Sequence, residues 1–595
     1  MPSEPNAASS RDDHHDGFQW LPLAQQLRET DRRSKVRDAA AGLNVALLAI
    51  PQGMAFAMIA GLAHQASGIL ASGTAAIIGA LFGSSRFTIL GPTNATALML
   101  FSASAAYGAA GAPIPLLVLL AGIILAAAAL LRLADLIQYV SRSVVVGYVA
   151  AAALLIAAGQ LRDALGIPPD PQRSGSFFVS LGRTLQSLPA ASPHAIAISA
   201  ASMSAYALLR RFRPQWPAFA LVLATISAAT AFLPQIHQHV LFLDRFQPNE
   251  LLPDWSKFSW SRLPLWLGPL TGPACAIAFI AALETSVMGK SLSGRAGRRA
   301  NPHQDLLACG LANAACAFSG GMPASGSLTR STLNFSSGAR TPLSALVCGV
   351  VCLAAALLLG NLTPHIPRAA LAALVICVTP ALFSVRHLRI CWKATRSDAI
   401  TLATTFFATL LLPLHTALFI GVAASIALYL RKASRPVLVE YEFNDEGTLR
   451  ERPEGSGRQH PRISIVHVEG ELFFGAAELF RTQIQRTARD PSLRIIILRM
   501  RNARHLDATS VMALEDLIRF LKADGRHLLL SGLSKDVYRV LLRSDMVDTI
   551  GRDNIFIGSA SNPNLSTRHA LKRAQQLLGT SDAEIQILYN PEAPR

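Results

Sequence analysis

The sequence predicts a polytopic α-helical membrane protein followed by a small α/β domain, and three observations support this class. Of the 595 residues, 51% are hydrophobic and 15% are charged, whereas soluble domains carry about 25% charged residues. Apolar runs recur from about residue 41 to residue 430. Beyond residue 435 the acidic and basic residues are nearly in balance, as in a soluble domain. This pattern argues against a soluble multidomain enzyme.

Residues 1–36 are expected to form a cytosolic leader. They are polar and charged, and they lack the apolar core and the small-residue cleavage site of a secretory signal. The membrane domain is predicted over residues 37–435. The seven cysteines lie in or beside apolar segments, without the paired spacing of a zinc site or a disulfide framework. No metal site and no cofactor is therefore expected.

Fourteen apolar windows, most of about 16 to 22 residues, are candidate transmembrane helices. They run over 40–62, 67–84, 92–108, 114–133, 141–160, 194–211, 216–235, 268–290, 303–319, 327–337, 341–360, 367–384, 397–413 and 415–431. Because seven is odd, two equal halves of seven helices have opposite orientations in the membrane. The count therefore predicts a seven-plus-seven inverted repeat, as in many secondary transporters.

Basic residues test the direction of these segments, since Lys and Arg favour cytoplasmic loops. If the leader is cytoplasmic, every even-numbered segment should end on the cytoplasmic side. The basic residues at those ends include Arg86, Arg132, Arg210, Arg295, Arg340, Arg386 and Arg431. Most of the net charge of +17 is therefore explained by basic residues in the predicted cytoplasmic loops, and no nucleic-acid partner is expected. We expect a multi-pass protein of a bacterial-type inner membrane with both termini in the cytoplasm.

The third and tenth segments are short and begin with residues that break helices. They are entered through Gly91-Pro92 and through the run 320–327, and they hold the same position in each half, which indicates a substrate site. A helix N-terminus has free N–H donors and a partial positive charge, so two such ends facing each other would form an anion cradle. The candidate ligands are Thr93, Asn94, Ser327, Leu328, Thr329 and Arg330. The alternative is that Gly and Pro only shape a turn and Arg330 is a solvated loop charge.

Glu284 is the only carboxylate of the eighth segment. An ionisable group at that depth costs about 2.5 to 3.5 kcal/mol by insertion scales, which suggests a task or a partner. Glu284 is therefore a candidate site for coupling to a proton or a cation. The alternative is an ion pair with Lys290 or Arg330 that serves packing alone.

In the first segment, Gln52 places a polar amide inside an apolar span, and Phe56 lies four residues further on the same helix face. Gln52 could hydrogen-bond a substrate, or it could join two helices as a single membrane amide often does.

The C-terminal part predicts a small α/β domain over 436–560. Apolar strand-like runs at 463–468, 494–500 and 527–530 alternate with helical patterns at 475–488, 509–523 and 535–543. Residues 561–595 form a polar C-terminal tail, with a short amphipathic helix expected near 567–578.

Three stretches of the membrane domain resemble the sulfate permease (SulP) family of anion transporters, whose animal members include chloride/bicarbonate exchangers and prestin. They are residues 50–57 (Ile-Pro-Gln-Gly-Met-Ala-Phe-Ala), residues 89–93 (Ile-Leu-Gly-Pro-Thr) and residues 310–331. The resemblance covers the chain from about residue 37 to residue 557.

The resemblance implies a core domain of helices one to four and eight to eleven, a gate domain of the other helices, and a homodimer. It implies that Gln52, Phe56, Thr93, Thr329 and Arg330 contact the anion. Glu284 matches the acid that prokaryotic members use for proton or sodium coupling. Two positions depart from the family pattern. The pair Thr93-Asn94 stands where many relatives carry larger apolar or aromatic residues, and Asp305 stands where Glu is common.

The soluble part resembles a STAS domain, a module shared with bacterial anti-sigma factor antagonists, through residues 471–478 and 506–510. The second stretch matches the loop that is phosphorylated in the antagonists, with Thr509 at the phosphoacceptor position. The alternative is that Asp507 and Thr509 only cap a helix.

The sequence thus predicts a secondary active transporter of small anions of the sulfate, bicarbonate, chloride or dicarboxylate class. Proton- or sodium-coupled symport and anion exchange both remain open. Its expected partners are the anion, membrane lipids and a second copy of the chain. One alternative is a nucleobase-type carrier of the same fold, which would need an acid on the tenth helix. Another is a membrane signalling scaffold that acts through the STAS domain. An enzyme is not expected, because the sequence shows no phosphate loop, nucleophile elbow or metal-ligand cluster.

Overall fold

The computed structural model describes most of the chain between residues 18 and 579. The described residues are 18–28, 30–62, 64–105, 113–135, 140–168, 177–213, 216–232, 239–245, 252–253, 263–297, 300–382, 384–435, 437–443, 449–453, 458, 461–559, 562 and 564–579. Two compact units make up the chain, Met1–Ser425 and Ile426–Arg595. The first is helical with one short pair of strands, and the second is built on a six-stranded sheet.

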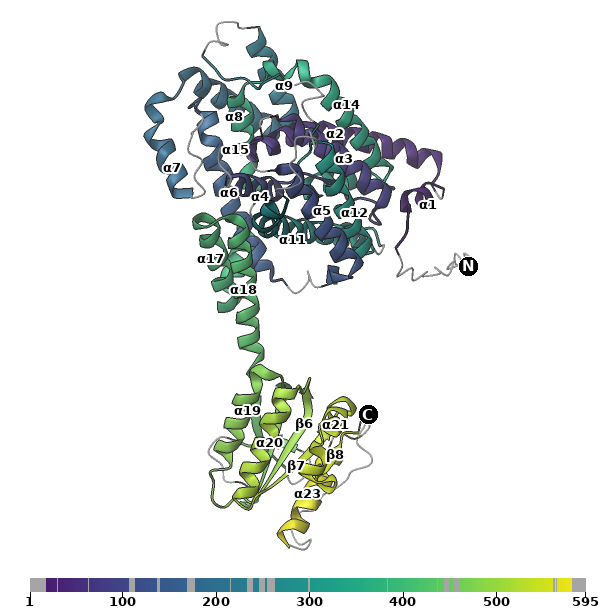
Figure 1. Ribbon diagram of the computed structural model, residues 1–595, viewed down its shortest axis with the longest axis vertical. Helices are drawn as coiled ribbons and strands as arrows, with labels where there is room; N and C mark the ends of the chain where they lie inside the picture. The colour runs from purple at the N-terminus through teal and green to yellow at the C-terminus, as the bar shows by residue number, and fades with distance from the viewer. Residues whose placement is uncertain are drawn as a thin grey trace, which may run out of the picture. The chain divides into compact units, whose positions relative to one another are not determined.

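Each of the fourteen predicted segments overlaps a helix, many of which Figure 1 labels. These helices are α2 (Arg32–Ile59), α3 (Ala66–Phe82), α4 (Asn94–Ala105), α5 (Ile114–Leu130), α6 (Arg142–Ala164), α8 (Pro193–Phe212), α9 (Ala218–Ala231), α11 (Leu263–Arg295), α12 (Pro302–Phe318), α13 (Leu328–Ser336), α14 (Leu343–Leu358), α15 (Arg368–Val378), α17 (Arg396–Leu411) and α18 (Leu414–Ala433). The sequence did not predict α1 (Pro22–Arg28), α7 (Phe177–Gln186) and α16 (Val385–Ala394). All three are short, and α7 and α16 are amphipathic, so a search for long apolar windows passes over them.

Four of these helices, α2, α6, α11 and α18, are long and apolar enough to cross a membrane. Among the described residues, α3, α5, α9, α14 and α15 are apolar but have only 10 to 17 residues. The predicted interrupted helices are shorter than an ordinary span, with 12 residues in α4 and 9 in α13. These short lengths agree with the prediction that the third and tenth segments are interrupted helices.

Several helix pairs in the described part of the first unit pack with their backbones in near contact, among them α5–α12 and α3–α14. A Cβ atom on Gly122 of α5 would lie 2.8 Å from the carbonyl oxygen of Gly310 on α12, and one on Gly310 would lie 2.9 Å from the carbonyl of Gly122. Gly73 of α3 and Gly349 of α14 make the same reciprocal approach, at 2.9 Å and 2.7 Å. Only glycine fits at these positions, so each pair fixes how closely its two helices pack.

The helices of the first unit form two groups of neighbours. In one group α5 packs against α12, and α2 and α3 pack against α14. In the other, α6 packs against α15 and α17, and α15 packs against α8. The labels of the two groups lie on opposite sides of this unit in Figure 1.

The second unit contains one mixed sheet with strand order β4-β3-β5-β6-β7-β8. Its strands are β3 (Val437–Phe443), β4 (Leu449–Glu451), β5 (Ile463–Glu471), β6 (Ile495–Arg504), β7 (His527–Leu533) and β8 (Ile555–Ile557). The central strands β5 to β8 are parallel, and β3 runs antiparallel to both β4 and β5. Strands β3, β4 and β8 were not predicted, because they lie toward the sheet edges and are short or interrupted by charged residues.

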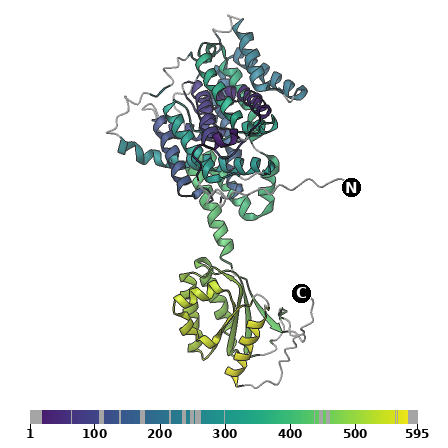
Figure 2. The ribbon, with the colours of Figure 1, turned by 90° about the vertical axis from the view of Figure 1, so that its right-hand side faces the viewer.

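Helices cover both faces of this sheet, as Figure 2 shows. They are α19 (Phe474–Thr487), α20 (Ala508–Ala523), α21 (Lys535–Arg543), α22 (Met546–Ile550) and α23 (Leu565–Leu578). Val466 and Val468 of β5 face the core formed with α19 and α20, whereas Ile463 and Ile465 face Leu571 of α23. Helix α23, which the sequence predicted in the C-terminal tail, therefore packs on the sheet. Residues 580–595 of the predicted tail lie outside the described residues.

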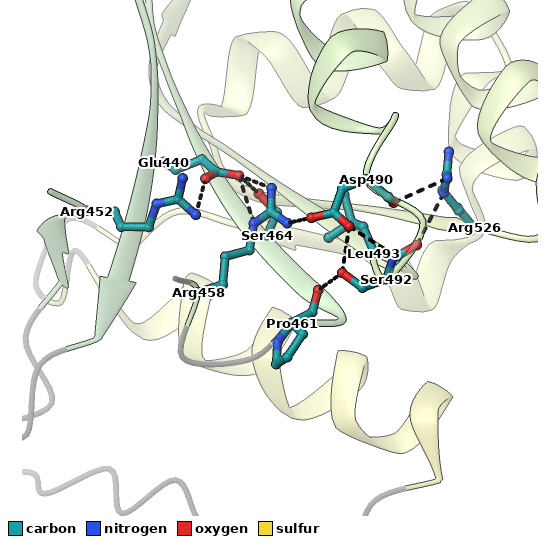
Figure 3. Close-up of polar contacts among 9 residues, drawn as sticks. All are labelled: Glu440, Arg452, Arg458, Pro461, Ser464, Asp490, Ser492, Leu493 and Arg526. Carbon is teal, nitrogen blue, oxygen red and sulfur yellow. Dashed lines mark hydrogen bonds and ion pairs between the residues drawn. The ribbon is translucent and has the colours of Figure 1, made fainter. Parts of the chain in front are cut away.

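A network of charged and polar groups joins β3 to the turn between α19 and β6 (Figure 3). Arg458 donates to Glu440 of β3 at 2.9 Å and also pairs with Asp490. The hydroxyl and backbone N–H of Ser492, together with Arg458, lower the pKa of Asp490 to about 2. The network fixes the antiparallel strand β3 to the parallel part of the sheet.

Candidate functional site

Two short strands bring the N-termini of α4 and α13 together. Strand β1 (Leu90–Gly91) pairs antiparallel with β2 (Ser325–Gly326), so that Leu90 faces Gly326 and Gly91 faces Ser325. A further bond runs from the N–H of Ser327 to the carbonyl of Ile89 at 3.1 Å. Helix α4 begins three residues after β1, and α13 begins two residues after β2. The two interrupted helices therefore start beside each other, as the sequence predicted.

Hydroxyl side chains cap both helices at this point. Thr93 and Thr96 bond reciprocally, with Thr96 Oγ1 accepting from the N–H of Thr93 at 2.9 Å and Thr93 Oγ1 accepting from the N–H of Thr96 at 3.3 Å. This arrangement is that of a capping box. Ser327 caps α13 and accepts from the N–H of Arg330 at 3.5 Å. The caps hold both helix ends, with their partial positive charge, in fixed positions.

A cavity of about 260 Å³ lies at these helix ends. One part of its lining comes from α2, α4, α11 and α13, and the other from α6, α9 and α15 with the short turn after it. The lining residues are Gln52, Ala55, Phe56, Ile59, Thr93, Asn94, Ala95, Tyr148, Val149, Ala152, Ile156, Phe219, Glu284, Ser327, Leu328, Thr329, Val375, Val378 and Thr379. Mostly apolar walls with a few convergent polar groups are typical of a small-molecule site.

The structure brings together all but one of the sequence-predicted substrate residues in this lining. Those in the lining are Gln52, Phe56, Thr93, Asn94, Ser327, Leu328 and Thr329, and the predicted coupling residue Glu284 joins them. Four helices contribute these side chains, and the outermost two residues, Gln52 and Thr329, are about 280 positions apart in the sequence. That they bind a substrate stays a prediction.

Glu284 bonds to the residues that start the two helices. Its Oε2 accepts from the hydroxyl of Thr93 at 2.9 Å and from the hydroxyl of Ser325. Within the described part of the chain no ion pair joins Glu284 to Lys290 or Arg330, and Lys290 is exposed. The alternative that Glu284 serves only to form an ion pair therefore finds no support in the observed contacts.

Arg330 is the predicted substrate residue that the structure places elsewhere. Its side chain is fully buried and lies outside the cavity lining. The guanidinium donates to Ser72 Oγ at 3.1 Å and to the carbonyl of Pro92, and it packs against Gly91. The alternative of a solvated loop charge is therefore wrong, whereas the expected contact of Arg330 with the anion stays a prediction. Arg330 lies against Gly91 of β1 and supplies a donor to the carbonyl of Pro92 in the turn before α4.

Gln52 is buried, and its Oε1 has no hydrogen-bond partner among the described residues. The alternative that Gln52 joins two helices through this oxygen is therefore not seen. Phe56 lies one helical turn further along α2 and is also buried, so the two side chains share one wall of the cavity.

The sequence did not predict the lining from α6, α9 and α15, which includes Tyr148, Phe219 and Val375. Long apolar segments carry no periodic signal that tells a cavity-facing residue from a lipid-facing one. The one usable signal was Tyr148, a hydroxyl-bearing ring within the apolar run of the fifth segment.

In the second unit, Asp507 caps α20. Its carboxylate accepts from the N–H of Ser510 at 2.9 Å and from the N–H of Phe474 at 2.7 Å. Although partial burial opposes the effect, these bonds hold the pKa of Asp507 below its usual value. Thr509 is exposed, and its side chain makes no hydrogen bond within the described residues. Asp507 rather than Thr509 is therefore the cap.

Family models match both parts of the chain. The model described as the sulfate permease family matches residues 36–405, and the STAS domain model matches residues 457–560. The chain is 27% identical over 593 residues to the low affinity sulfate transporter 3 of Stylosanthes hamata, which covers 92% of the chain and 91% of that protein. It is 26% identical over 564 residues to the sodium-independent sulfate anion transporter of Bos taurus, covering 89% of the chain and 88% of the relative.

A solved structure shares the fold. The murine solute carrier 26 family member A9 anion transporter, solved in an inward-facing state, matches with a TM-score of 0.84 at 18% identity and covers 96% of this chain and 97% of its own. The fold is thus a helical transmembrane domain followed by a C-terminal STAS domain with a sheet. On the sequence match over its helical unit, this chain belongs to the sulfate permease family, a family of transporters and not of enzymes.

Proposed function

We propose that this protein is a secondary active transporter that carries a small anion in the cavity between the two helix groups. The adjoining N-termini of α4 and α13 supply N–H dipoles and hydroxyl groups that favour a negative charge. The relatives are named as sulfate transporters, which makes sulfate the first anion to test. Bicarbonate, chloride and dicarboxylates suit the same donors.

Coupling of this transport to a proton or sodium ion is proposed through Glu284. The carboxylate and a bound anion share a cavity of about 260 Å³, where two negative charges repel strongly because little water screens them. A cation that binds at Glu284 removes this repulsion. The observation that carries the proposal is the bonding of Glu284 to Thr93 and Ser325, since the same residues shape the anion cradle. This arrangement supports symport of the anion with a cation.

The packing supports the proposed fourteen-helix inverted repeat. If helices one to seven correspond to helices eight to fourteen, the pair α5–α12 joins the fourth helix to the ninth, and the pair α3–α14 joins the second to the eleventh. Exchange of the halves turns one pair into the other, and both pairs carry the reciprocal glycine contact. The same exchange relates α6–α17 to α15–α8. On this basis the first helix group is the core and the second is the gate.

We also propose the membrane orientation and the oligomeric state of the protein. The basic residues at the ends of even-numbered segments support cytoplasmic termini in a bacterial-type plasma membrane. We propose a homodimer on the basis of the family resemblance alone.

Replacing Glu284 by Gln tests the coupling. Glutamine keeps an oxygen that can accept from Thr93 and Ser325 but cannot take up a proton or hold a cation by charge. In proteoliposomes, we expect the wild type to accumulate labelled sulfate in response to an inward proton or sodium gradient. The E284Q variant should lose about tenfold or more of this gradient-driven uptake.

A matched control is Asp398→Asn. Asp398 accepts from Ser143 Oγ at 2.8 Å and lies outside the cavity lining, so D398N should keep the gradient response. Equal gradient-driven uptake by E284Q and the wild type would show that Glu284 does not couple transport.

A further inference from the structure

Tyr148 of α6 carries a buried hydroxyl group that the fold does not satisfy. The side chain is 2% exposed, and its ring packs in the apolar core of the first unit. Its Oη has no hydrogen-bond partner in the described structure. Since nearly all buried hydroxyl groups in native proteins are hydrogen-bonded, this one needs a partner from outside the chain.

The position of Tyr148 indicates where that partner binds. The residue lines the cavity together with Gln52, whose Oε1 is also buried and without a partner among the described residues. The other lining residues from α6, α9 and α15 are apolar, apart from Thr379. Thr379 already donates its hydroxyl proton to the carbonyl of Val375 at 2.8 Å. Within the described lining, Tyr148 thus offers the free hydroxyl proton on the gate side.

We propose that Tyr148 Oη donates a hydrogen bond to an oxyanion bound in the cavity. The inference rests on the proposed function, that the cavity holds the transported anion. The helix ends of α4 and α13 bind the anion from the core side, and Tyr148 binds it from the gate side. An oxyanion such as sulfate has oxygen atoms that point in several directions, so it can accept from both sides at once. A monatomic halide leaves much of a cavity of about 260 Å³ unfilled.

This contact makes Tyr148 a specificity residue and a link between the two helix groups. Because α6 belongs to the proposed gate, the bond forms only when core and gate close on the anion. The bound oxyanion then stabilises the closed arrangement in a way that chloride does not.

The test is Tyr148→Phe in the full-length protein, with Tyr206→Phe as the matched control. Tyr206 is a buried tyrosine of α8 whose hydroxyl accepts from Arg210 at 3.2 Å, outside the cavity lining. Binding of sodium sulfate and of sodium chloride is measured by saturable thermal stabilisation, with sodium gluconate holding the sodium concentration constant. Saturation separates site binding from the general stabilising effect of sulfate on proteins.

We expect Y148F to bind sulfate about tenfold or more weakly than the wild type, as for loss of one hydrogen bond to a charged group. Its chloride affinity should change much less, and Y206F should bind sulfate as the wild type does. Without anion, Y148F should be at least as stable as the wild type, because no bond within the protein is lost. A lower unfolding temperature without anion, with sulfate affinity unchanged, would instead show a structural role.

Two failures are distinguishable. If the wild type shows saturable sulfate binding and Y148F shows the same affinity, the inference about Tyr148 is wrong while the proposed anion site stands. If neither sulfate nor chloride stabilises the wild type saturably, the proposed function fails, and the inference fails with it.

Discussion

Arg330 lies outside the cavity lining and packs against the backbone of Gly91, just before α4. The guanidinium is fully buried and bonds to Ser72 and to the carbonyl of Pro92, which lies two residues before α4 begins. It thereby fixes the turn that aims α4 at the cavity. Its positive charge also lies within electrostatic range of Glu284 without forming an ion pair. Arg330 is therefore a positioning residue in this conformation.

Gly91→Ala tests this role, because the side chain of Arg330 packs directly on Gly91. A Cβ atom there would lie 2.6 Å from Arg330 Nη1 and 2.8 Å from Nη2. The buried guanidinium has to move and lose its bond to Pro92. We expect G91A to lower the free energy of unfolding by about 1 to 3 kcal/mol, as overpacked positions do, and to reduce sulfate uptake.

The matched control is Gly159→Ala in α6, where a Cβ atom would meet nothing within 4 Å. Alanine is favoured over glycine in a helix, so G159A should be neutral or stabilising. If G91A unfolds at the same temperature as G159A and transports normally, Arg330 does not hold the turn before α4.

At the scale of the element, the STAS helices depend on one carboxylate. Asp507 caps α20 and also accepts from the first N–H of α19, so it holds the starts of two helices together. Asp507→Ala should lower protection of these first turns against hydrogen exchange in the full-length protein by about fivefold, which corresponds to about 1 kcal/mol for a lost cap.

The carboxylate's lowered pKa means that it stabilises the fold above its ordinary pKa of about 4. The difference between D507A and the wild type should therefore shrink as the pH falls below that value.

Thr509→Ala is the control for this cap, since Thr509 is exposed and lies two residues after Asp507. Equal loss of protection in T509A and D507A would overturn the assignment of Asp507 as the cap. Phosphorylation of Thr509 stays a proposal. Its hydroxyl is exposed at a helix N-terminus, where a phosphate is favoured.

For the whole molecule, the sequence predicted the helices far better than the walls of the cavity. All fourteen helices followed from apolar windows, and the interruption of two of them, α4 and α13, followed from Gly91-Pro92 and the glycine-rich run before Ser327. The polar lining on the core side was predictable because Gln52 and Glu284 are rare residue types in such segments. The gate side was not, since its apolar residues look like any lipid-facing surface. The contacts of Arg330 with Ser72 and Pro92 were not predictable, because they depend on a turn that sequence patterns do not specify.

The central claim is that the N-termini of α4 and α13 bind the transported anion. Thr329 is exposed in the cavity lining and is the second residue of α13, where an acidic side chain is compatible with the helix dipole. Thr329→Asp therefore places a fixed negative charge in the anion's position without breaking the helix. Thr329→Asn has nearly the same shape and no charge.

The decisive measurement is uptake of labelled sulfate by these two variants in proteoliposomes. We predict that T329D transports at least about tenfold more slowly than T329N, because the fixed charge repels the anion from a poorly solvated cavity. Equal uptake by T329D and T329N would contradict an anion site at these helix ends.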